Sequence, residues 1–543
     1  MHGRRVAGRR GAGRRVAVTL LAAALVLGAL VIPRGVSSPA AFLRIPVEAL
    51  LAVALLLVLP ARPRRVVAGV LGALLGLLTV LALVDTGFHT VLARPFDPVV
   101  DGALLGDAVG FLSGSFGAPA AAGAVVGAVV LAVAVPVLVT LAVLRLSRVV
   151  VRRRNAATRA VAVLVPAWLA CALLGAQIVP GVPVAAASAA DLVRDTVVGV
   201  PASLRDRHEF AAQIAVDPFG DIPGDALLGA LRGKDVVVAF VESHGRYGVE
   251  DPGIGAVLDD GTRRLDAAGF ASRSGFLTSP IVGGGSWLAH ATFGSGLRID
   301  DQQRYRTLMA SDRRTLSSAF RDAGHRTVAV MPGTTQAWPE QEFYGFDRLL
   351  DFAALGYRGP DLGWGTVPDQ FTLSAFARLD RTTSVPIMAE IALVSSHTPW
   401  EYVPPLLGWD DLGDGSVYRS LAATGAEETG AGETGAGETG AGETTGAAYR
   451  RSIEYSLRSL VSFVRTHGDD DLVLLVLGDH QPLPAVTGEG AGRDVPISIV
   501  TRDPAVLDRI SGWGWQAGLR PGPQAPVWPM EDFRDRFLTA FAR

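Results

Sequence analysis

Three apolar stretches in the C-terminal half of the chain lead into side chains that can bind metals or transfer protons. Asp235–Val241 runs directly into Glu242, and two later stretches run into His397 and into the pair Asp479 and His480. One such residue after a strand is more often a solvated loop residue. Three together favour a shared site, because ligands bind outside the carboxyl ends of the strands in an open α/β sheet.

A fourth candidate follows three glycines. Gly283–Gly285 precede Ser286, and the segment after Ser286 is compatible with a helix. The glycines permit a sharp turn and a close approach of the backbone. At a helix N-terminus, backbone N–H groups favour anions, and a divalent cation on the serine oxygen would activate it as a nucleophile. The alternative is a serine that only caps the helix. A Walker-type phosphate loop is excluded, because no Gly-Lys-Ser/Thr follows.

Strands and helices are expected to alternate around these residues. The expected strands are short apolar stretches rich in β-branched residues: Asp235–Val241, His325–Met331, Ile387–Val394, Leu472–Leu477 and Pro496–Val500. Amphipathic segments such as Thr315–Ala323 and Tyr449–Thr466 lie between them. This alternation predicts an α/β domain with a mostly parallel central sheet and helices on both faces.

In their order along the chain, these motifs resemble the alkaline phosphatase/sulfatase superfamily. They are a glutamate after the first strand, a glycine-rich turn with a hydroxyl nucleophile, a Ser-His-x-Pro segment, and a late Gly-Asp-His followed by Asp-Val-Pro. Within that superfamily the chain looks most like lipoteichoic acid synthases and phosphoglycerol transferases. The apolar N-terminal part fits that group as well.

The resemblance implies a role for each motif residue. Glu242, Ser286, Asp479 and His480 match positions that hold one divalent cation in the family, and Ser286 matches its nucleophile. His397 matches a histidine that contacts the phosphate or the leaving group. Further candidates for substrate binding, each with an ordinary structural hydrogen bond or surface charge as the alternative, are His244, Arg246, Trp287, His290, Arg298 and Arg304.

Two departures from the superfamily narrow the activity. Sulfatases convert a Cys or Ser followed by x-Pro-x-Arg into formylglycine, but Ser286 is followed by Trp-Leu-Ala-His. An arylsulfatase-type mechanism is therefore disfavoured. The full two-zinc ligand set of alkaline phosphatases is not evident either. A set of carboxylates, a hydroxyl and an imidazole suits one Mn²⁺ or Mg²⁺, with Zn²⁺ as an alternative.

The N-terminal third has the pattern of a membrane domain. Five apolar runs, at residues 16–33, 45–61, 66–84, 121–144 and 160–179, each approach the ~20 residues that a helix needs to cross the hydrocarbon core. A cleaved signal peptide is disfavoured for the first run, because four more runs follow it. We expect a five-helix transmembrane domain over residues 1–185, a partly helical linker over 186–225 and a catalytic domain over 226–543.

The arginine distribution predicts the orientation. Arginines cluster before the first run and after the second and fourth runs, whereas residues 85–120 contain only Arg94 beside four aspartates. By the positive-inside rule, the N-terminus is cytoplasmic. Five crossings then place the catalytic domain on the extracytoplasmic side of the cell membrane.

The composition of the chain excludes several kinds of function and site. The net charge of −2 gives no global support to nucleic-acid binding. The single cysteine, Cys171, excludes a disulfide within the chain and a thiolate metal cluster. Residues 424–446 repeat Gly-Ala-Gly-Glu-Thr with almost no apolar side chains, which predicts a disordered insertion.

The expected location indicates the substrate class. The outer membrane face offers no nucleoside triphosphate, so a membrane lipid is the natural donor. The leading hypothesis is transfer of a phosphorylated headgroup, such as phosphoglycerol, to a cell-envelope polymer or glycan through a phospho-Ser286 intermediate. The alternatives are phosphodiester or sulfate-ester hydrolysis in the same fold, and a catalytically silent membrane scaffold. The intact set of candidate metal ligands argues against the scaffold.

Overall fold

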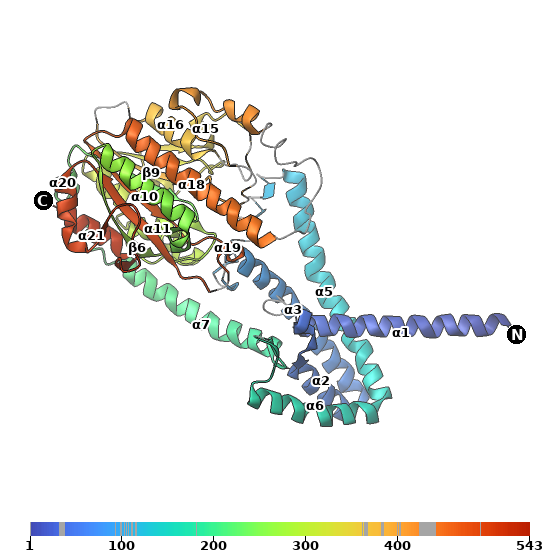
Figure 1. Ribbon diagram of the computed structural model, residues 1–543. Coiled ribbons are helices and arrows are strands. Elements are labelled where there is room, and N and C mark those ends of the chain that lie inside the picture. The colour runs from blue at the N-terminus through green and yellow to red at the C-terminus, as the bar shows by residue number, and fades with distance from the viewer. Residues whose placement is uncertain are drawn as a thin grey trace. The chain divides into compact units, whose positions relative to one another are not determined.

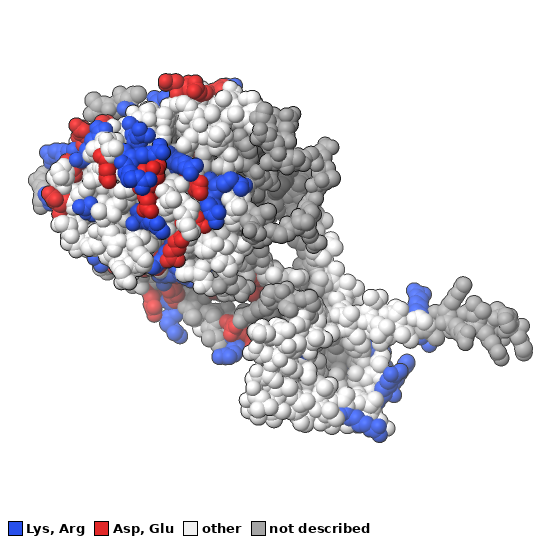
Figure 2. Space-filling model, viewed as in Figure 1, with Lys and Arg blue, Asp and Glu red and all other residues white. Residues whose placement is uncertain are grey.

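The computed structural model divides into two compact units, whose boundary in the chain lies between Arg205 and Asp206. It describes residues 2–31, 39–92, 94–97, 100–102, 104, 106, 108–109, 112–113, 117–180, 182–360, 362, 367–381, 385–398, 400, 403–422, 441–488 and 490–542. Figure 1 shows a helical unit and an α/β unit. In Figure 2 most of the visible surface of the helical unit is uncharged and basic side chains gather at a few places, whereas the surface of the α/β unit carries both signs.

In the part of the helical unit that the structure describes, four helices are long and apolar enough to cross a membrane, which makes this a membrane protein. The spans are Gly13–Val31, Ala61–His89, Ala118–Arg152 and Arg154–Leu174. They belong to α1 (His2–Val31), α3 (Ala61–Leu92), α5 (Ala118–Arg152) and α6 (Arg154–Leu174). The unit also contains η1 (Pro39–Leu43), the short strands β1 (Ile45–Pro46), β2 (Gln177–Val179), β3 (Val182–Pro183) and β4 (Ala185–Ala186), and the start of α7 (Ser188–Ile214).

The expected fifth span is not confirmed. The run at residues 45–61 forms only α2 (Val47–Val58), with 12 residues. At 1.5 Å per residue this helix is roughly 18 Å long, short of the ~30 Å hydrocarbon core. Pro46 is its N-cap, and Pro60 follows it. The acidic residue in this apolar run has a local role, because Glu48 Oε1 accepts the N–H groups of Ala189 and Ala190 at 3.0 Å each.

The α/β unit is built on a nine-stranded sheet. Its strands run in the order β12-β6-β11-β10-β5-β9-β7-β8, and β13 also pairs with β6. Their bounds are β5 (Asp235–Val241), β6 (Ala271–Thr278), β7 (Arg326–Met331), β8 (Arg348–Asp351), β9 (Ile387–Leu393), β10 (Leu472–Gly478), β11 (Asp494–Thr501), β12 (Gln516–Ala517) and β13 (Val527–Pro529). All five strands expected from the sequence are present.

The sheet is mixed, and the expectation of a mostly parallel sheet holds only in part. The five neighbours β10, β5, β9, β7 and β8 are parallel, whereas β11 is antiparallel to both β10 and β6. A parallel return needs a long crossover, usually a helix. The connection from β10 to β11 contains only the short α19 (Pro484–Thr487), so β11 returns in the opposite direction.

Two layers of helices cover the sheet. Side chains of α11 (Ser286–Ser295), α12 (Gln302–Met309), α13 (Leu316–Asp322), α20 (Pro504–Arg509) and α21 (Asp532–Phe541) share one apolar core with Val238 and Phe240 of β5. Side chains of α10 (Pro252–Ala267), α16 (Asp369–Leu379) and α18 (Ala441–His467) share the other core with Val237 and Ala239. Figure 1 shows α10 and α18 side by side.

Short helices complete the unit. They are α8 (Gly224–Leu227), η2 (Gly229–Leu231), α9 (Arg246–Glu250), α14 (Gln341–Tyr344), α15 (Phe352–Leu355), η3 (Trp409–Asp411) and η4 (Ser511–Trp513). The disordered insertion expected at 424–446 lies outside the described residues as far as residue 440. Its last six positions, 441–446, are helical, because α18 begins at Ala441.

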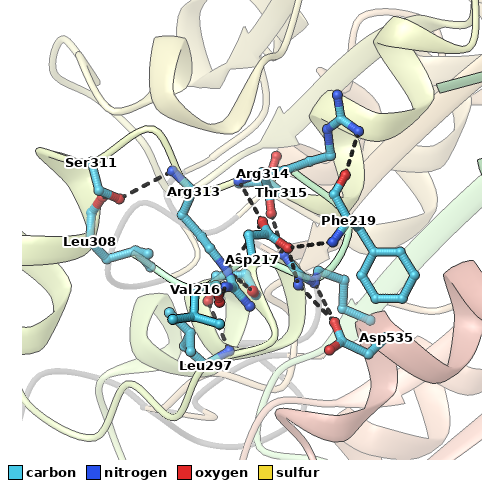
Figure 3. Close-up of polar contacts among 12 residues, drawn as sticks. Val216, Asp217, Phe219, Leu297, Leu308, Ser311, Arg313, Arg314, Thr315 and Asp535 are labelled. Atoms are coloured by element: carbon cyan, nitrogen blue, oxygen red, sulfur yellow. Dashed lines mark hydrogen bonds and ion pairs between the residues drawn. The ribbon is translucent and has the colours of Figure 1, made fainter. Parts of the chain in front are cut away.

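A buried ion-pair network fastens the segment after α7 to the C-terminal helix. Arg534 of α21 is fully buried and bonds Asp217 at 3.0 and 3.2 Å. Asp217 also accepts the backbone N–H groups of Phe219 and Arg314, and Figure 3 shows its carboxylate at the centre of these contacts. Burial opposes ionisation of this carboxyl, but Arg534 outweighs it and lowers the pKa of Asp217.

Replacing Asp217 with Asn should destabilise the α/β unit by roughly 3 kcal/mol. The buried Arg534 would lose the more buried of its two counter-charges and keep only Asp535, which is 38% exposed. Urea unfolding of the solubilised chain, followed by tryptophan fluorescence, measures this, since eight of the nine tryptophans lie after residue 206. The matched control is Asp260→Asn, which removes two exposed ion pairs, with Arg263 and Arg264, and should change little. Equal effects of the two variants would contradict the structural role of the network.

Candidate functional site

The candidate site lies at the carboxyl edge of two central strands. β5 and β10 are parallel neighbours, with Gly478 opposite Val241 at their ends. The next residue of each strand, Glu242 and Asp479, therefore emerges at the same edge of the sheet. Ser286, the first residue of α11, comes from the helix that covers this face.

The four predicted ligands meet at this edge. Ser286 Oγ donates a hydrogen bond to Glu242 Oε2 at 2.9 Å and lies 3.3 Å from His480 Nε2. His480 Nε2 lies 3.3 Å from Glu242 Oε1 and 3.5 Å from Asp479 Oδ2. Potential ligand atoms of Glu242, Asp479 and His480 all lie within 4.8 Å of one another. One small ion can therefore touch all four side chains.

Backbone groups hold the carboxylates in place. Asp479 Oδ1 accepts the N–H groups of Ser243 and His480 at 2.8 Å each. Ser243 has a φ of 58°, the only positive value among the described non-glycine residues, and it costs backbone strain. Its carbonyl accepts the Tyr449 hydroxyl at 2.9 Å, and its own hydroxyl donates to Glu242 Oε1 at 2.9 Å. The strained residue is thus fixed from three sides.

The glycine-rich turn before Ser286 has the conformation that the sequence predicts. Gly283 and Gly285 have φ values of 74° and 108°, a region that favours glycine. The preceding Ser279 donates its hydroxyl to the Asp479 carbonyl at 2.6 Å. The turn is therefore tied directly to the strand end that carries two of the candidate ligands.

The donor set fits a divalent cation. His480 Nδ1 lies 2.7 Å from the Gln481 carbonyl, which can only accept, so Nδ1 donates. The lone pair of a neutral His480 then lies on Nε2 and faces the oxygens of Glu242 and Asp479. Three electron-pair donors directed at one point repel each other unless a proton or a cation lies between them. Oxygen and imidazole ligands without a thiolate suit Mn²⁺, Mg²⁺ or Zn²⁺.

The close approach of Glu242, Asp479 and His480 also shifts their pKa values. Burial and the charge of Glu242 raise the pKa of Asp479 to about 6. Burial alone would lower the pKa of His480, but the charges of Asp479 and Glu242 raise it to about 9. Burial likewise opposes ionisation of Glu242, but His480 and then His397 lower its pKa. Positive charge is strongly favoured at this point.

His397 lies on the loop after β9, next to this cluster. Its Nδ1 donates to the Thr398 carbonyl at 2.5 Å, which orients the imidazole ring. The neighbouring Ser396 donates its hydroxyl to the Glu242 carbonyl at 2.6 Å. Three strand ends, those of β5, β9 and β10, therefore contribute to one site.

The six further candidates differ in their contacts. Trp287 is 41% exposed beside Ser286, and His290 lies one helical turn farther along α11. The other four make structural contacts. His244 is buried beside an apolar cavity, Arg246 pairs with Glu250 and Asp494, Arg298 pairs with Asp300, and Arg304 pairs with Asp206.

Sequence reasoning missed several residues that shape the site. Ser243, Ser279 and Tyr449 act through hydrogen bonds whose partners are far away in the chain, and nothing local marks them. Glu390 did carry a signal, because it is the one charged residue in the apolar stretch Ile387–Val394. It accepts a hydrogen bond from His290.

Comparisons with known proteins give structural matches only. No family model matches the chain, and no curated protein matches it. The chain is similar to the integral membrane protein lipooligosaccharide phosphoethanolamine transferase A from Neisseria meningitidis, at 13% identity and a TM-score of 0.45, covering 96% of this chain and 95% of that one. It is also similar to the lipoteichoic acid synthase LtaP from Listeria monocytogenes, at 13% identity and a TM-score of 0.37, covering 61% and 76%.

A third match is the Streptococcus pyogenes phosphoglycerol transferase GacH in complex with sn-glycerol-1-phosphate, at 12% identity and a TM-score of 0.36, covering 62% of this chain and 91% of that one. A protein of the alkaline phosphatase superfamily from Vibrio parahaemolyticus is similar as well, at 15% identity and a TM-score of 0.32, covering 53% and 70%. Since the TM-scores lie below 0.5, the chemistry of the site depends on the residues of this chain.

Adding one methyl group at Gly478 should damage the site without touching a ligand. A Cβ there would lie 1.8 Å from the His244 carbonyl oxygen, whereas one at Gly492 would meet nothing within 4 Å. Gly478→Ala should therefore push the ends of β5 and β10 apart and lower Mn²⁺ affinity at least about tenfold, and Gly492→Ala should not. Calorimetric titration of both variants tests this, and equal affinities would argue against the shared edge as the ion site.

Proposed function

We propose that this membrane protein is a metal-dependent phosphotransferase that moves a phosphorylated lipid headgroup, such as phosphoglycerol, to a cell-envelope polymer or glycan. The observation that carries the proposal is the convergence of Ser286, Glu242, Asp479 and His480 at one edge of the sheet. Ser286 is placed to act as the nucleophile, because it begins α11, where N–H groups and the helix dipole favour a phosphoryl anion.

The proposed reaction has two displacements. Ser286 Oγ gives its proton to Glu242 Oε2, to which it donates a hydrogen bond, and forms a bond to phosphorus, while the bond from phosphorus to the lipid alcohol breaks. Glu242 returns this proton to Oγ in the second displacement. An acceptor hydroxyl then attacks phospho-Ser286, and the bond between Oγ and phosphorus breaks. His397 donates a proton to the departing lipid alcohol and takes one from the incoming hydroxyl, a contribution of about 10²–10⁴-fold.

Glu242, Ser286, Asp479 and His480 would hold one divalent cation, Mn²⁺ or Mg²⁺ with Zn²⁺ as an alternative. When bound, the ion polarises a phosphoryl oxygen and lowers the pKa of the Ser286 hydroxyl. Trp287 and His290 extend the site along α11 and are proposed to contact the substrate. The exposed indole of Trp287 is held by a hydrogen bond from Nε1 to Gln302 at 3.0 Å.

Labelled phosphatidylglycerol supplied with Mn²⁺ and an acceptor glycan tests the reaction. Transfer gives a labelled glycan, whereas phosphodiester hydrolysis, the competing activity of the same residues, gives free glycerol phosphate. Ser286→Ala should lower turnover by at least about a thousandfold. Ser511→Ala, at an exposed serine of η4, is the matched control and should retain activity. Full turnover by Ser286→Ala would remove Ser286 as the nucleophile.

We further propose that the α/β unit lies on the extracytoplasmic side, where the lipid donor and envelope acceptor meet. The arginines at the start of α3 and between the apolar parts of α5 and α6 support this side, because both groups then face the cytoplasm. Three crossings, by α3, α5 and α6, lead from the first of these groups to the outside, whether or not the short α2 crosses. A reporter fused after Arg543 that fluoresces only in the cytoplasm should stay dark. The same reporter fused after Arg153, in an arginine-rich connection between α5 and α6, should fluoresce. A bright fusion after Arg543 would place the catalytic unit inside the cell.

A further inference from the structure

A glutamate lies in the middle of the sheet, where a carboxylate is costly. Glu390 is the fourth residue of β9, a central strand between β5 and β7, and only 5% of its surface is exposed. It pairs with Val238 of β5 and Ala329 of β7, and both of these belong to the apolar core on the α11 side. Because paired residues share a face, Glu390 points into that core.

His290 covers this carboxylate. Its Nδ1 lies 2.7 Å from Glu390 Oε1, and the two side chains are 12% and 6% exposed. Its ring stacks on Phe240 at 3.8 Å between centroids, which fixes the plane of the imidazole. Since an ionised carboxylate only accepts hydrogen bonds, Nδ1 donates and Nε2 is directed elsewhere.

The pair lies beside the reaction centre. Residues four apart on a helix share a face, so His290 follows Ser286 by one turn on the same side of α11. Phe240 lies on β5 and Glu242 follows its last residue. Glu242 continues the pairing with β9 through a hydrogen bond from its N–H to the Leu393 carbonyl, so the two side chains share a face. His290 contacts Phe240, and Ser286, one turn earlier on α11, contacts Glu242. The two contacts therefore lie next to each other between α11 and the sheet.

We propose that Glu390 is a positioning residue that holds His290 as an imidazolium whose Nε2–H binds a non-bridging oxygen of the phosphoryl group at Ser286. The idea deepens the proposed function and rests on it for the identity of the substrate. This role explains why an ionisable residue occupies a core position of β9. An anionic ligand is bound by the positive charge of His290, and Glu390 supplies the negative charge that stabilises it. The ligand class is a phosphate monoester or diester anion.

A purely structural pair makes a different prediction. A buried ion pair replaced by apolar residues of similar volume often leaves stability unchanged or improved. The double variant His290→Leu with Glu390→Leu should therefore unfold at or above the parental temperature. If the pair serves only the core, this variant keeps full activity. If the pair binds the phosphoryl group, the folded variant loses ligand affinity and turnover.

Two measurements on the full-length protein separate this inference from the proposed function. The first is binding of inorganic phosphate in the presence of Mn²⁺, and the second is turnover of labelled phosphatidylglycerol. Glu390→Gln keeps an acceptor for Nδ1–H but removes the charge, so phosphate should bind about tenfold more weakly. The double Leu variant should bind phosphate at least about a hundredfold more weakly. The matched control is Glu454→Gln on α18, where the glutamate pairs with Arg458.

Parental phosphate affinity in both Glu390→Gln and the folded double variant would overturn the inference, whether or not the lipid is turned over. If the parental protein does not turn over the lipid but its phosphate affinity still depends on Glu390, the proposed lipid substrate is wrong and the role of the His290–Glu390 pair is supported. A loss confined to turnover, with phosphate binding unchanged, would also count against the assigned contact.

Discussion

The site depends on the in-register parallel pairing of β5 and β10. That pairing ends at Val241 and Gly478, so Glu242 and Asp479 leave the sheet as neighbours. The absence of a side chain at Gly478 lets the chain after β5 cross close to the end of β10. Two carboxylates brought together in a buried place repel each other, and this repulsion creates the demand for a positive charge that His480 and a cation can meet.

The surrounding hydrogen bonds limit how the carboxylates can relax. Asp479 is held by two backbone N–H groups, and Glu242 by the hydroxyls of Ser243 and Ser286. The strain at Ser243 is tolerated because Tyr449, on α18, reaches its carbonyl from the opposite face of the sheet. Both helical layers thus contribute to the geometry of one edge. A rigid set of ligands of this kind favours a charged transition state, because the donors do not have to reorganise.

The helical unit obeys a different constraint. Its long helices expose large apolar side chains such as Leu131 and Leu173, which is stable only in a lipid environment. Its apolar runs are not equivalent, however. In the run of residues 45–61, prolines at both ends limit the helix to 12 residues. The run also contributes Glu48, which caps the start of α7. Hydropathy alone does not distinguish such a short helix from a spanning one.

The sequence by itself determined the elements with strong local signals. These are the long apolar helices, the five β-branched strands and the glycine turn before Ser286, because periodicity and glycine conformations act over a few residues. It also predicted Glu242, Ser286, Asp479 and His480 as candidate ligands, through their order along the chain and the family that this order resembles, and the structure brings these four side chains together. Only the tertiary structure decided the antiparallel direction of β11, the polar-patterned strand β6, the length of α2, and the partners of Ser243, Tyr449 and Glu390. Each of these depends on contacts between residues far apart in the chain, and no local pattern encodes such contacts.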